Sequence, residues 1–224
     1  MPRVVSTSRA RAGGKLKLAI PRGALWSDTL DALDRVGTDT AELRSDSRSL
    51  VFEVDGLTLV TMRPSDIPTY VEAGAADLGI TGKDVLLEQR ERVVYEVLDL
   101  HYGACRMVLA GREGDPALGE SERRLGGMRI ATKYPRIAER HFEETGRQAE
   151  VIEVKGSVEL APIVGLADGI VDLVATGRTL ADNGLEVREE IAVCTARLVA
   201  NRVSHKLRAR EVDGLVERFR EATQ

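Results

Sequence analysis

Residues 170–185 read I-V-D-L-V-A-T-G-R-T-L-A-D-N-G-L, and the interpretation of the whole chain starts from them. Residues 170–174 are apolar except for Asp172, a pattern that predicts a mostly buried strand. Two threonines, a glycine and an arginine follow in one turn, and from Leu180 the spacing is helical up to Gly184. A strand, a glycine-containing turn and a helix N-terminus can together bind a phosphate group. An ordinary connecting turn uses the same residues, so both interpretations remain open here.

The composition indicates a folded, globular protein. Of the 224 residues, 43% are hydrophobic and 30% are charged, which suffices for a core in one domain or two small lobes. The formal net charge of −4 argues against a nucleic-acid or membrane-surface partner, because such proteins usually carry a basic excess. No apolar run is long enough to cross a bilayer. We therefore expect neither nucleic acid nor membrane among the partners.

The N-terminus and the cysteines favour a cytoplasmic location. Residues 1–14 are basic and rich in Ser, Arg and Gly, without a hydrophobic segment, so we expect a disordered tail and not a secretory signal. Cys105 and Cys194 lie in apolar stretches without C-x-x-C spacing, which favours buried thiols over a disulfide or a metal site. The three histidines pair with no Cys, Ser or second His in sequence, so no triad or zinc site is indicated.

The first half of the chain alternates strands and helices. Residues 15–20 predict a strand that turns at P-R-G, and Ser27 can cap the helix that follows. Residues 51–60 predict a hairpin around the dipeptide D-G. Arg22 lies between the first strand and its helix, where a cation can meet a ligand, although an isolated arginine there is more often solvated.

A short internal repeat divides the chain into two similar units. Five residues of the window 74–86 recur in the window 169–181 at a constant spacing of 172 − 77 = 95 residues. Lys83 stands opposite Arg178, and each copy follows a short helix that contains a proline. A duplicated α/β unit predicts two lobes whose strand-to-helix turns face a cleft between them.

Two extended runs, at residues 95–111 and 190–203, predict the crossings between these lobes. The expected fold is α/β, with a mixed, mostly parallel sheet in each lobe and the active site in the cleft. We assign a disordered tail to residues 1–14, lobe I to residues 15–103 and 188–224, and lobe II to residues 104–187.

Several stretches resemble one enzyme family. Residues 159–180, E-L-A-P-I-V-G-L-A-D-G-I-V-D-L-V-A-T-G-R-T-L, are similar to the signature of ATP phosphoribosyltransferase, the first enzyme of histidine biosynthesis. Shorter stretches are also similar to that family: P-R-G-A-L from Pro21, R-P-S-D-I-P-T-Y-V-E from Arg63, D-L-H-Y-G-A-C-R from Asp99 and R-I-A-T-K-Y-P from Arg129. The resemblance covers residues 15–206 and implies a two-lobed fold like that of the type II periplasmic binding proteins.

The resemblance implies a reaction and its partners. The phosphoribosyl group of phosphoribosyl pyrophosphate is expected to move to N1 of ATP, with Mg²⁺ carried by the substrates' phosphates. The chain ends one helix after the resemblance, as in the short form of the family, which works with a histidyl-tRNA-synthetase-like regulatory subunit in a hetero-oligomer. Self-association as a homodimer is also expected. The alternative is a two-lobed sensor that binds small anions or nucleotides without chemistry.

The resemblance also implies which residues bind the donor. The loop at residues 175–180 would hold the 5-phosphate of the donor, and two carboxylates would contact its ribose hydroxyls. The expected donor-binding residues are Glu159, Asp172, Ala175, Thr176, Gly177, Arg178, Thr179 and Leu180.

The opposite side of the site is expected to hold ATP and pyrophosphate. Arg48 matches a loop arginine that meets the substrates' phosphates, and it forms the expected catalytic pair with Arg22. The family's usual P-K-G-R-L reads P-R-G-A-L here, so Ala24 replaces a cation and Arg22 could assist the departure of pyrophosphate. The other expected contacts in this group are Gly23, Arg63, Asp66, Asp99 and Lys133.

The implied chemistry needs no protein nucleophile, because adenine N1 carries its own free lone pair. Positive charge develops at the anomeric carbon while pyrophosphate leaves with negative charge. We therefore expect catalysis by positioning and electrostatic stabilisation. The cations expected on turns that face the cleft are Arg22, Arg48, Arg63, Lys133 and Arg178.

Overall fold

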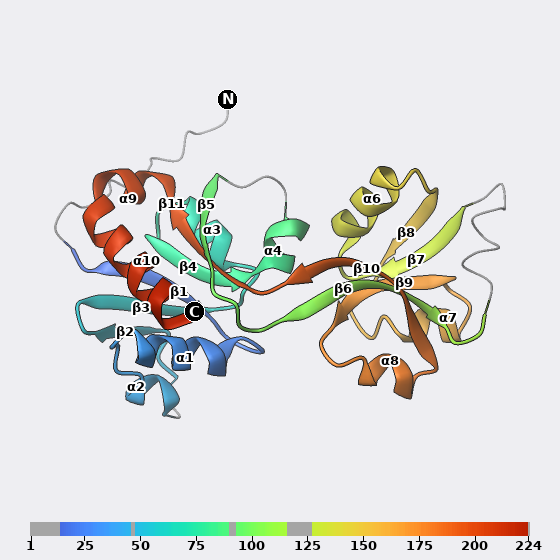
Figure 1. The fold of residues 1–224 in the computed structure, drawn as a ribbon, viewed down its shortest axis with the longest axis horizontal. Coiled ribbons are helices and arrows are strands. Elements are labelled where there is room, and N and C mark those ends of the chain that lie inside the picture. Colours follow the sequence, from blue (N-terminus) through green and yellow to red (C-terminus); the bar gives the residue numbers. More distant parts are fainter. Residues whose placement is uncertain (1–13, 46–47, 90–92, 116–126, 224) are drawn as a thin grey trace. The chain divides into compact units, whose positions relative to one another are not determined.

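The computed structural model describes residues 14–45, 48–89, 93–115 and 127–223. The predicted tail, apart from Gly14, lies outside these residues. The chain forms two compact units (Figure 1). Unit 1 contains Met1–Leu86, Arg90–Gly103 and Thr195–Gln224, and unit 2 contains Leu87–Gln89 and Ala104–Cys194.

Unit 1 is built on a six-stranded mixed sheet. Its strands are β1 (Leu16–Pro21), β2 (Val51–Val54), β3 (Leu57–Met62), β4 (Leu78–Gly82), β5 (Val94–Asp99) and β11 (Ala196–Asn201). They are arranged in the order β2-β3-β1-β4-β11-β5, in which β1 is parallel to both of its neighbours and β11 is antiparallel to both of its neighbours. The predicted hairpin is confirmed, because β2 and β3 pair antiparallel around Asp55 and Gly56, both at positive φ.

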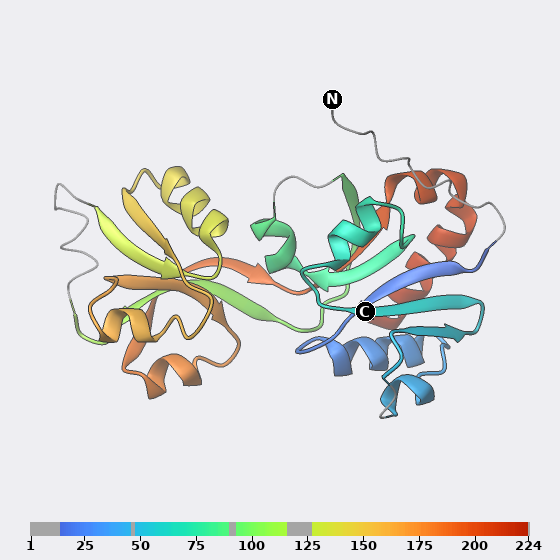
Figure 2. The same cartoon turned by 180° about the vertical axis from the view of Figure 1, so that it is seen from behind.

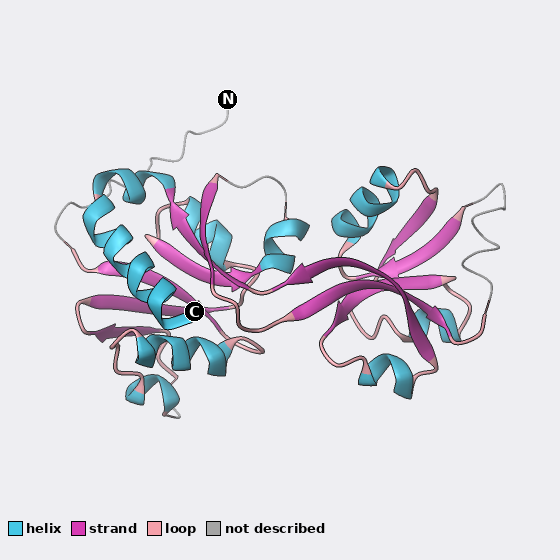
Figure 3. Cartoon of the chain, viewed as in Figure 1, coloured by secondary structure: helices cyan, strands magenta, loops and turns pink. Residues whose placement is uncertain are grey.

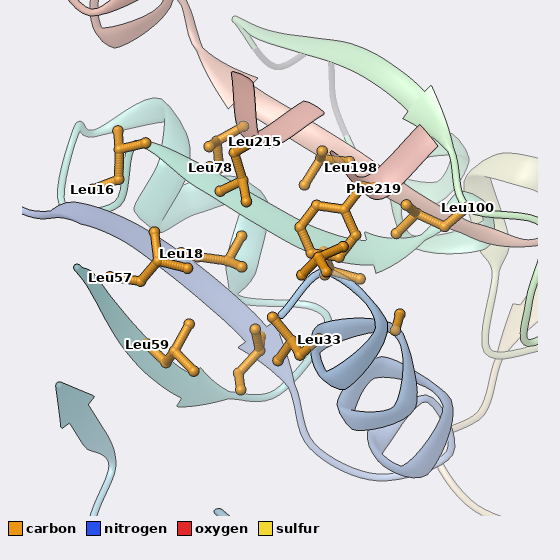
Figure 4. Close-up of a cluster of buried hydrophobic side chains, with 14 of the residues drawn as sticks. Leu16, Leu18, Leu33, Leu57, Leu59, Leu78, Leu100, Leu198, Leu215 and Phe219 are labelled. Atoms are coloured by element: carbon orange, nitrogen blue, oxygen red, sulfur yellow. The ribbon is translucent and has the colours of Figure 1, made fainter. Parts of the chain in front are cut away.

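Helices cover both faces of this sheet. They are α1 (Trp26–Arg35), α2 (Ala41–Arg44), α3 (Ile67–Glu72), α4 (Lys83–Glu88), α9 (Arg202–Leu207) and α10 (Ala209–Thr223). Alternate residues of β1, such as Leu16 and Leu18, pack with Leu33 of α1 and Phe219 of α10 on one face (Figure 4). Ala19, which follows Leu18 and so points to the opposite face, packs against α3.

Unit 2 repeats this plan with five strands. They are β6 (Cys105–Arg112), β7 (Met128–Thr132), β8 (Ala149–Glu153), β9 (Gly169–Val174) and β10 (Leu185–Cys194), in the order β10-β6-β9-β7-β8. The helices are α6 (Pro135–Glu144), α7 (Leu160–Ile163) and α8 (Arg178–Asp182) (Figure 3). Helix α6 lies on one face of this sheet, and α7 and α8 lie on the other (Figure 2). One apolar cluster joins the sheet to α6, and a second joins the opposite face to α7 and α8.

The two units share a topology, but in a different register from the predicted repeat. Asp77 precedes β4 and accepts a hydrogen bond from the Lys17 N–H, and Asp168 precedes β9 and accepts one from the Arg129 N–H. The structural partner of Asp77 is therefore Asp168, four residues before Asp172. The sequence match gave the wrong register because the two T-G pairs that it aligned occupy different structural positions. Thr81 and Gly82 are buried in β4, whereas the later T-G lies beyond the end of β9.

Other differences concern the ends of elements. The helix predicted after Ser27 begins at Trp26, without a side-chain cap. The helix expected after the family resemblance is present as α10, but it begins at Ala209, and a separate short helix, α9, precedes it across Arg208. Residues 188–194, which the sequence-based division gave to lobe I, belong to unit 2, because β10 continues to Cys194 and stays paired with β6.

Replacing Asn201 with alanine should destabilise unit 1 by about 2–4 kcal/mol. The buried Asn201 Oδ1 accepts hydrogen bonds from the N–H groups of Val203 and Ser204, both at 2.9 Å, and caps α9. Its Nδ2 donates to the Val71 carbonyl at 2.7 Å at the end of α3. Urea unfolding measures the loss. The exposed Asn183→Ala, which also removes a bond to a helix carbonyl, should cost under about 0.5 kcal/mol, and equal losses would contradict the prediction.

Candidate substrate-binding site

The turn after β9 has the geometry of an anion-binding loop. Gly177 adopts a left-handed conformation, with φ of +80°, directly before the first residue of α8. The backbone N–H of Arg178 lies 3.4 Å from Thr176 Oγ1. Ala175, Thr176, Arg178 and Thr179 are exposed, so their backbone and hydroxyl groups are open to a ligand. The sequence predicted this strand, turn and helix, and the structure has all three.

Two of the expected donor-binding side chains point elsewhere. Leu180 is buried in the apolar cluster under α8, so it can contact a ligand only through its backbone. The Arg178 side chain is 86% exposed, and its Nε lies 3.6 Å from Asp182 Oδ2 one turn along the helix. The loop therefore offers backbone N–H groups and threonine hydroxyls.

Charged side chains gather at the same edge of the second sheet. Asp172 occupies β9 with its side chain 12% exposed, and its Oδ2 lies 3.9 Å from Nζ of Lys133, which follows β7. Glu159, directly before α7, is close enough to raise the pKa of Asp172. Because β7 and β9 are parallel, their carboxyl ends bring these residues to one edge. Glu159 and Asp172, both expected to bind the donor, thus lie together with Lys133, which was expected among the contacts to ATP and pyrophosphate.

The buried carboxyl group of Asp172 is expected to lower the free energy of unfolding at neutral pH. Burial raises its pKa, and the Leu173 N–H and Lys133 lower it by less. A carboxyl whose pKa is higher in the folded state stabilises the fold as the pH falls through that pKa. Asp172→Asn should therefore raise the free energy of unfolding at pH 7 by about 1 kcal/mol. Urea unfolding at pH 7 and pH 4 should show this gain shrinking as Asp172 becomes protonated. A variant less stable than the wild type at pH 7 would refute the pKa argument.

Arg22 is held in a fixed orientation at the end of β1. Its guanidinium lies 4.5 Å from the ring centroid of Trp26, and its Nη2 lies 3.4 Å from the carbonyl oxygen of Ser49. Its Nε is buried and has no hydrogen-bond partner among the described residues. A buried donor without an acceptor favours an anionic ligand at this position. Trp26, the only tryptophan of the chain, was not among the site residues predicted from the sequence.

The two residues that follow Arg48 in its loop are each held by a hydrogen bond. Ser49 accepts the Arg22 hydrogen bond, and the Leu50 carbonyl accepts one from the Thr61 N–H of β3 at 2.8 Å. Arg48 itself is exposed. The contact at Ser49 brings the loop of Arg48 to the end of β1, so the two arginines of the expected catalytic pair are carried by adjoining segments.

The remaining unit 1 residues follow two different patterns. Gly23, Arg63 and Asp66 are exposed in the segments that follow the carboxyl ends of the parallel strands β1 and β3. Asp99, at the end of β5, instead belongs to a polar network: Oδ1 accepts from the Thr195 hydroxyl at 2.7 Å, and Oδ2 lies 2.8 Å from Arg197 Nη2. Burial raises the pKa of Asp99, but these partners and the His101 N–H outweigh it and lower the pKa.

The described residues contain no group of three or more His, Cys, Asp or Glu side chains that could hold a metal ion. Carboxylate oxygens are the ligands that Mg²⁺ prefers, and it usually binds through one or two of them together with substrate phosphates. The carboxylates of Asp172 and Glu159 could bind Mg²⁺ in this way, together with phosphates of the substrates. Among the same residues, no helix is long and apolar enough to cross a membrane.

Comparisons with known proteins point to one family. The family model of HisG, ATP phosphoribosyltransferase, matches residues 63–221. The ATP phosphoribosyltransferase of Rubrobacter xylanophilus is 52% identical over 202 residues, which are 90% of this chain and 93% of the relative. That of Caldanaerobacter subterraneus is 45% identical over 208 residues, which are 92% of this chain and 96% of the relative.

Solved structures agree in fold. A structure described as the ATP phosphoribosyl transferase (HisG:HisZ) complex from Thermotoga maritima has a TM-score of 0.77 and 38% identity, and covers 93% of this chain and 98% of its own. The periplasmic aliphatic sulphonate binding protein SsuA of Escherichia coli has a TM-score of 0.61 at 14% identity, covering 95% of this chain and 73% of its own. The second likeness concerns the fold alone, and it confirms the expected fold like that of the periplasmic binding proteins.

Proposed function

The chain belongs to the ATP phosphoribosyltransferase family, pentosyltransferases that carry out the first step of histidine biosynthesis, and we propose that residues on both of its sheets share this reaction. Adenine N1 of ATP attacks the anomeric carbon of phosphoribosyl pyrophosphate. The bond from that carbon to the pyrophosphate oxygen breaks, giving N1-(5-phosphoribosyl)-ATP and pyrophosphate. The observation that carries the assignment of residues is the Gly177 turn beside Lys133 and the buried Asp172.

The edge of the second sheet binds the phosphoribosyl group. The backbone N–H groups of the Gly177 turn and the hydroxyls of Thr176 and Thr179 hold the 5-phosphate. Asp172 and Glu159 accept hydrogen bonds from the ribose hydroxyls, and Lys133 lowers the pKa of Asp172 against the larger raising effect of burial. Arg178 contributes through its N–H and its positive charge near the phosphate.

The edge of the first sheet binds the polyphosphates. Arg22 and Arg48 stabilise the negative charge that develops on the departing pyrophosphate, and the buried Nε of Arg22 is one donor for it. The planar guanidinium of Arg22 offers several donors in fixed directions, which can serve where Ala24 replaces the family's second cation. Gly23, Arg63 and Asp66 contact ATP or pyrophosphate, and Asp99 orients Arg197 beside them.

Members of this family use Mg²⁺ with their phosphate substrates. An ion carried by those phosphates would supply neutralisation of their negative charge. The carboxylates of Asp172 and Glu159 would supply its protein oxygens. The main role of both carboxylates is to accept hydrogen bonds from the ribose hydroxyls, and this role does not depend on the ion.

The experiment that tests the function measures product directly. With ATP, phosphoribosyl pyrophosphate and Mg²⁺ present, we expect the absorbance of N1-(5-phosphoribosyl)-ATP and an equal amount of pyrophosphate. Omitting either substrate is the control. Binding of both substrates without any pyrophosphate release, alone and with a regulatory subunit, would favour the sensor instead.

The chain works in the cytoplasm together with a regulatory subunit. The Thermotoga maritima structure is described as a HisG:HisZ complex. By that likeness this chain binds a HisZ-like subunit, related to histidyl-tRNA synthetase, in a hetero-oligomer, and associates with a second copy of itself. Sedimentation of the chain alone should give a dimer, and a larger species should form when a HisZ-like subunit is added. A monomer that ignores the subunit would contradict both assignments.

A further inference from the structure

The two cysteines of the chain lie directly opposite each other in the second sheet. Cys105 begins β6, Cys194 ends β10, and the antiparallel register pairs these two residues. Opposed residues in an antiparallel pair have Cα atoms about 4.5–5.5 Å apart and side chains on the same face. A disulfide needs Cα atoms about 4.4–6.8 Å apart. The register alone therefore brings both sulfurs within bonding range after side-chain rotation.

The surroundings of the pair are consistent with this register. Met107 and Leu109, which alternate with Cys105 along β6, belong to the apolar cluster beneath α6, and Ala192 packs against the same cluster. Cys194 is buried and Cys105 is half-buried, so Cys105 is the more exposed of the two residues. Neither cysteine forms a disulfide in the structure.

The pair also lies where the chain passes between its two units. Ala104 and Cys194 are the first and last residues of the long segment of unit 2, and the Ala196 N–H donates to the Tyr102 carbonyl at 2.9 Å just beyond them. A covalent bond here would fix the spacing of both connecting segments at their unit 2 ends.

We propose that Cys105 and Cys194 form a redox-sensitive pair that a hydroperoxide converts to an intramolecular disulfide. The Cys105 thiolate attacks the peroxide, takes up one oxygen as a sulfenic acid and releases an alcohol or water. The Cys194 thiol then attacks the Cys105 sulfur, the disulfide forms, and the oxygen leaves as water. A thiol reductant returns both cysteines. The inference does not depend on the proposed function.

The test uses the full chain, hydrogen peroxide and thiol counting. After exposure, the protein is denatured, alkylated and digested without reductant. We expect two thiols lost per chain, a linked peptide pair containing Cys105 and Cys194, and recovery of both thiols with dithiothreitol. Two alkylated thiols per chain after exposure, or links only between two chains, would overturn the proposal.

Two variants examine the mechanism and the register. In Cys194→Ser, dimedone should trap several-fold more Cys105 sulfenic acid than in the wild type, because the second thiol is gone. Adding Val193→Cys to that variant moves the thiol one residue along β10, opposite Arg106 and on the other face. That double variant should form no intramolecular disulfide. Disulfide formation as fast as in the wild type would show that register does not decide the reaction.

Discussion

Replacing Gly177 with valine should weaken the binding of phosphoribosyl pyrophosphate at least about 100-fold. Space around the new side chain is not the obstacle, because the nearest atom to an added Cβ would be Val174 Cγ1 at 3.9 Å. The obstacle is the backbone, since φ is +80° and a β-branched residue strongly disfavours the left-handed region. The turn must change shape, and its N–H groups no longer converge on the phosphate. Calorimetric titration with the donor measures the loss.

Gly165 provides a matched control in the same unit. Its φ is +76° and no atom lies within 4 Å of an added Cβ, so valine there should impose similar strain. Gly165 follows α7 at the amino end of β9, away from the carboxyl end where Gly177 lies. Gly165→Val should lower stability while leaving donor affinity within about threefold. Near-normal donor affinity in Gly177→Val, or equal losses in both variants, would refute the phosphate loop.

The sequence predicted the fold well where local patterns decide it. The β9 strand, the β2–β3 hairpin and the existence of two similar units all follow from apolar periodicity and turn residues. The register of the repeat was wrong because turn dipeptides recur for several reasons. The hydrogen bonds that Asp77 and Asp168 accept from the neighbouring strands define the true register, and they depend on pairing between distant segments.

The site was predictable to a similar extent. Residue types and the family signature selected Glu159, Asp172 and the Gly177 turn. What each side chain contacts could not be read in advance, because it depends on rotamers and on neighbours from other strands. Leu180 turns into the core, and Arg22 stacks on Trp26. Although Trp26 is only four residues from Arg22, neither residue type specifies this stack on its own.

Replacing Arg48 with alanine should lower the turnover number about 100-fold while changing donor affinity by less than about threefold. Arg48 is exposed on a loop whose next two residues are anchored by Arg22 and by β3. A cation on an anchored loop can meet charge that grows on the leaving pyrophosphate without contributing much to ground-state binding. Steady-state kinetics and donor titration together separate the two effects.

Arg44→Ala is the matched control, because Arg44 lies four residues earlier and its Nη2 lies 2.7 Å from both Asp31 and Asp34. Those partners neutralise its charge, so its loss should leave turnover unchanged. Equal losses of turnover and donor affinity in Arg48→Ala would mean that Arg48 binds the donor in the ground state. No loss of turnover would mean that Arg22 stabilises the departing pyrophosphate instead. The Arg22 guanidinium is held in place by its stack on Trp26 and its hydrogen bond to Ser49. In that case Arg22→Lys, which keeps the charge but removes the planar donors, should show the fall in turnover instead.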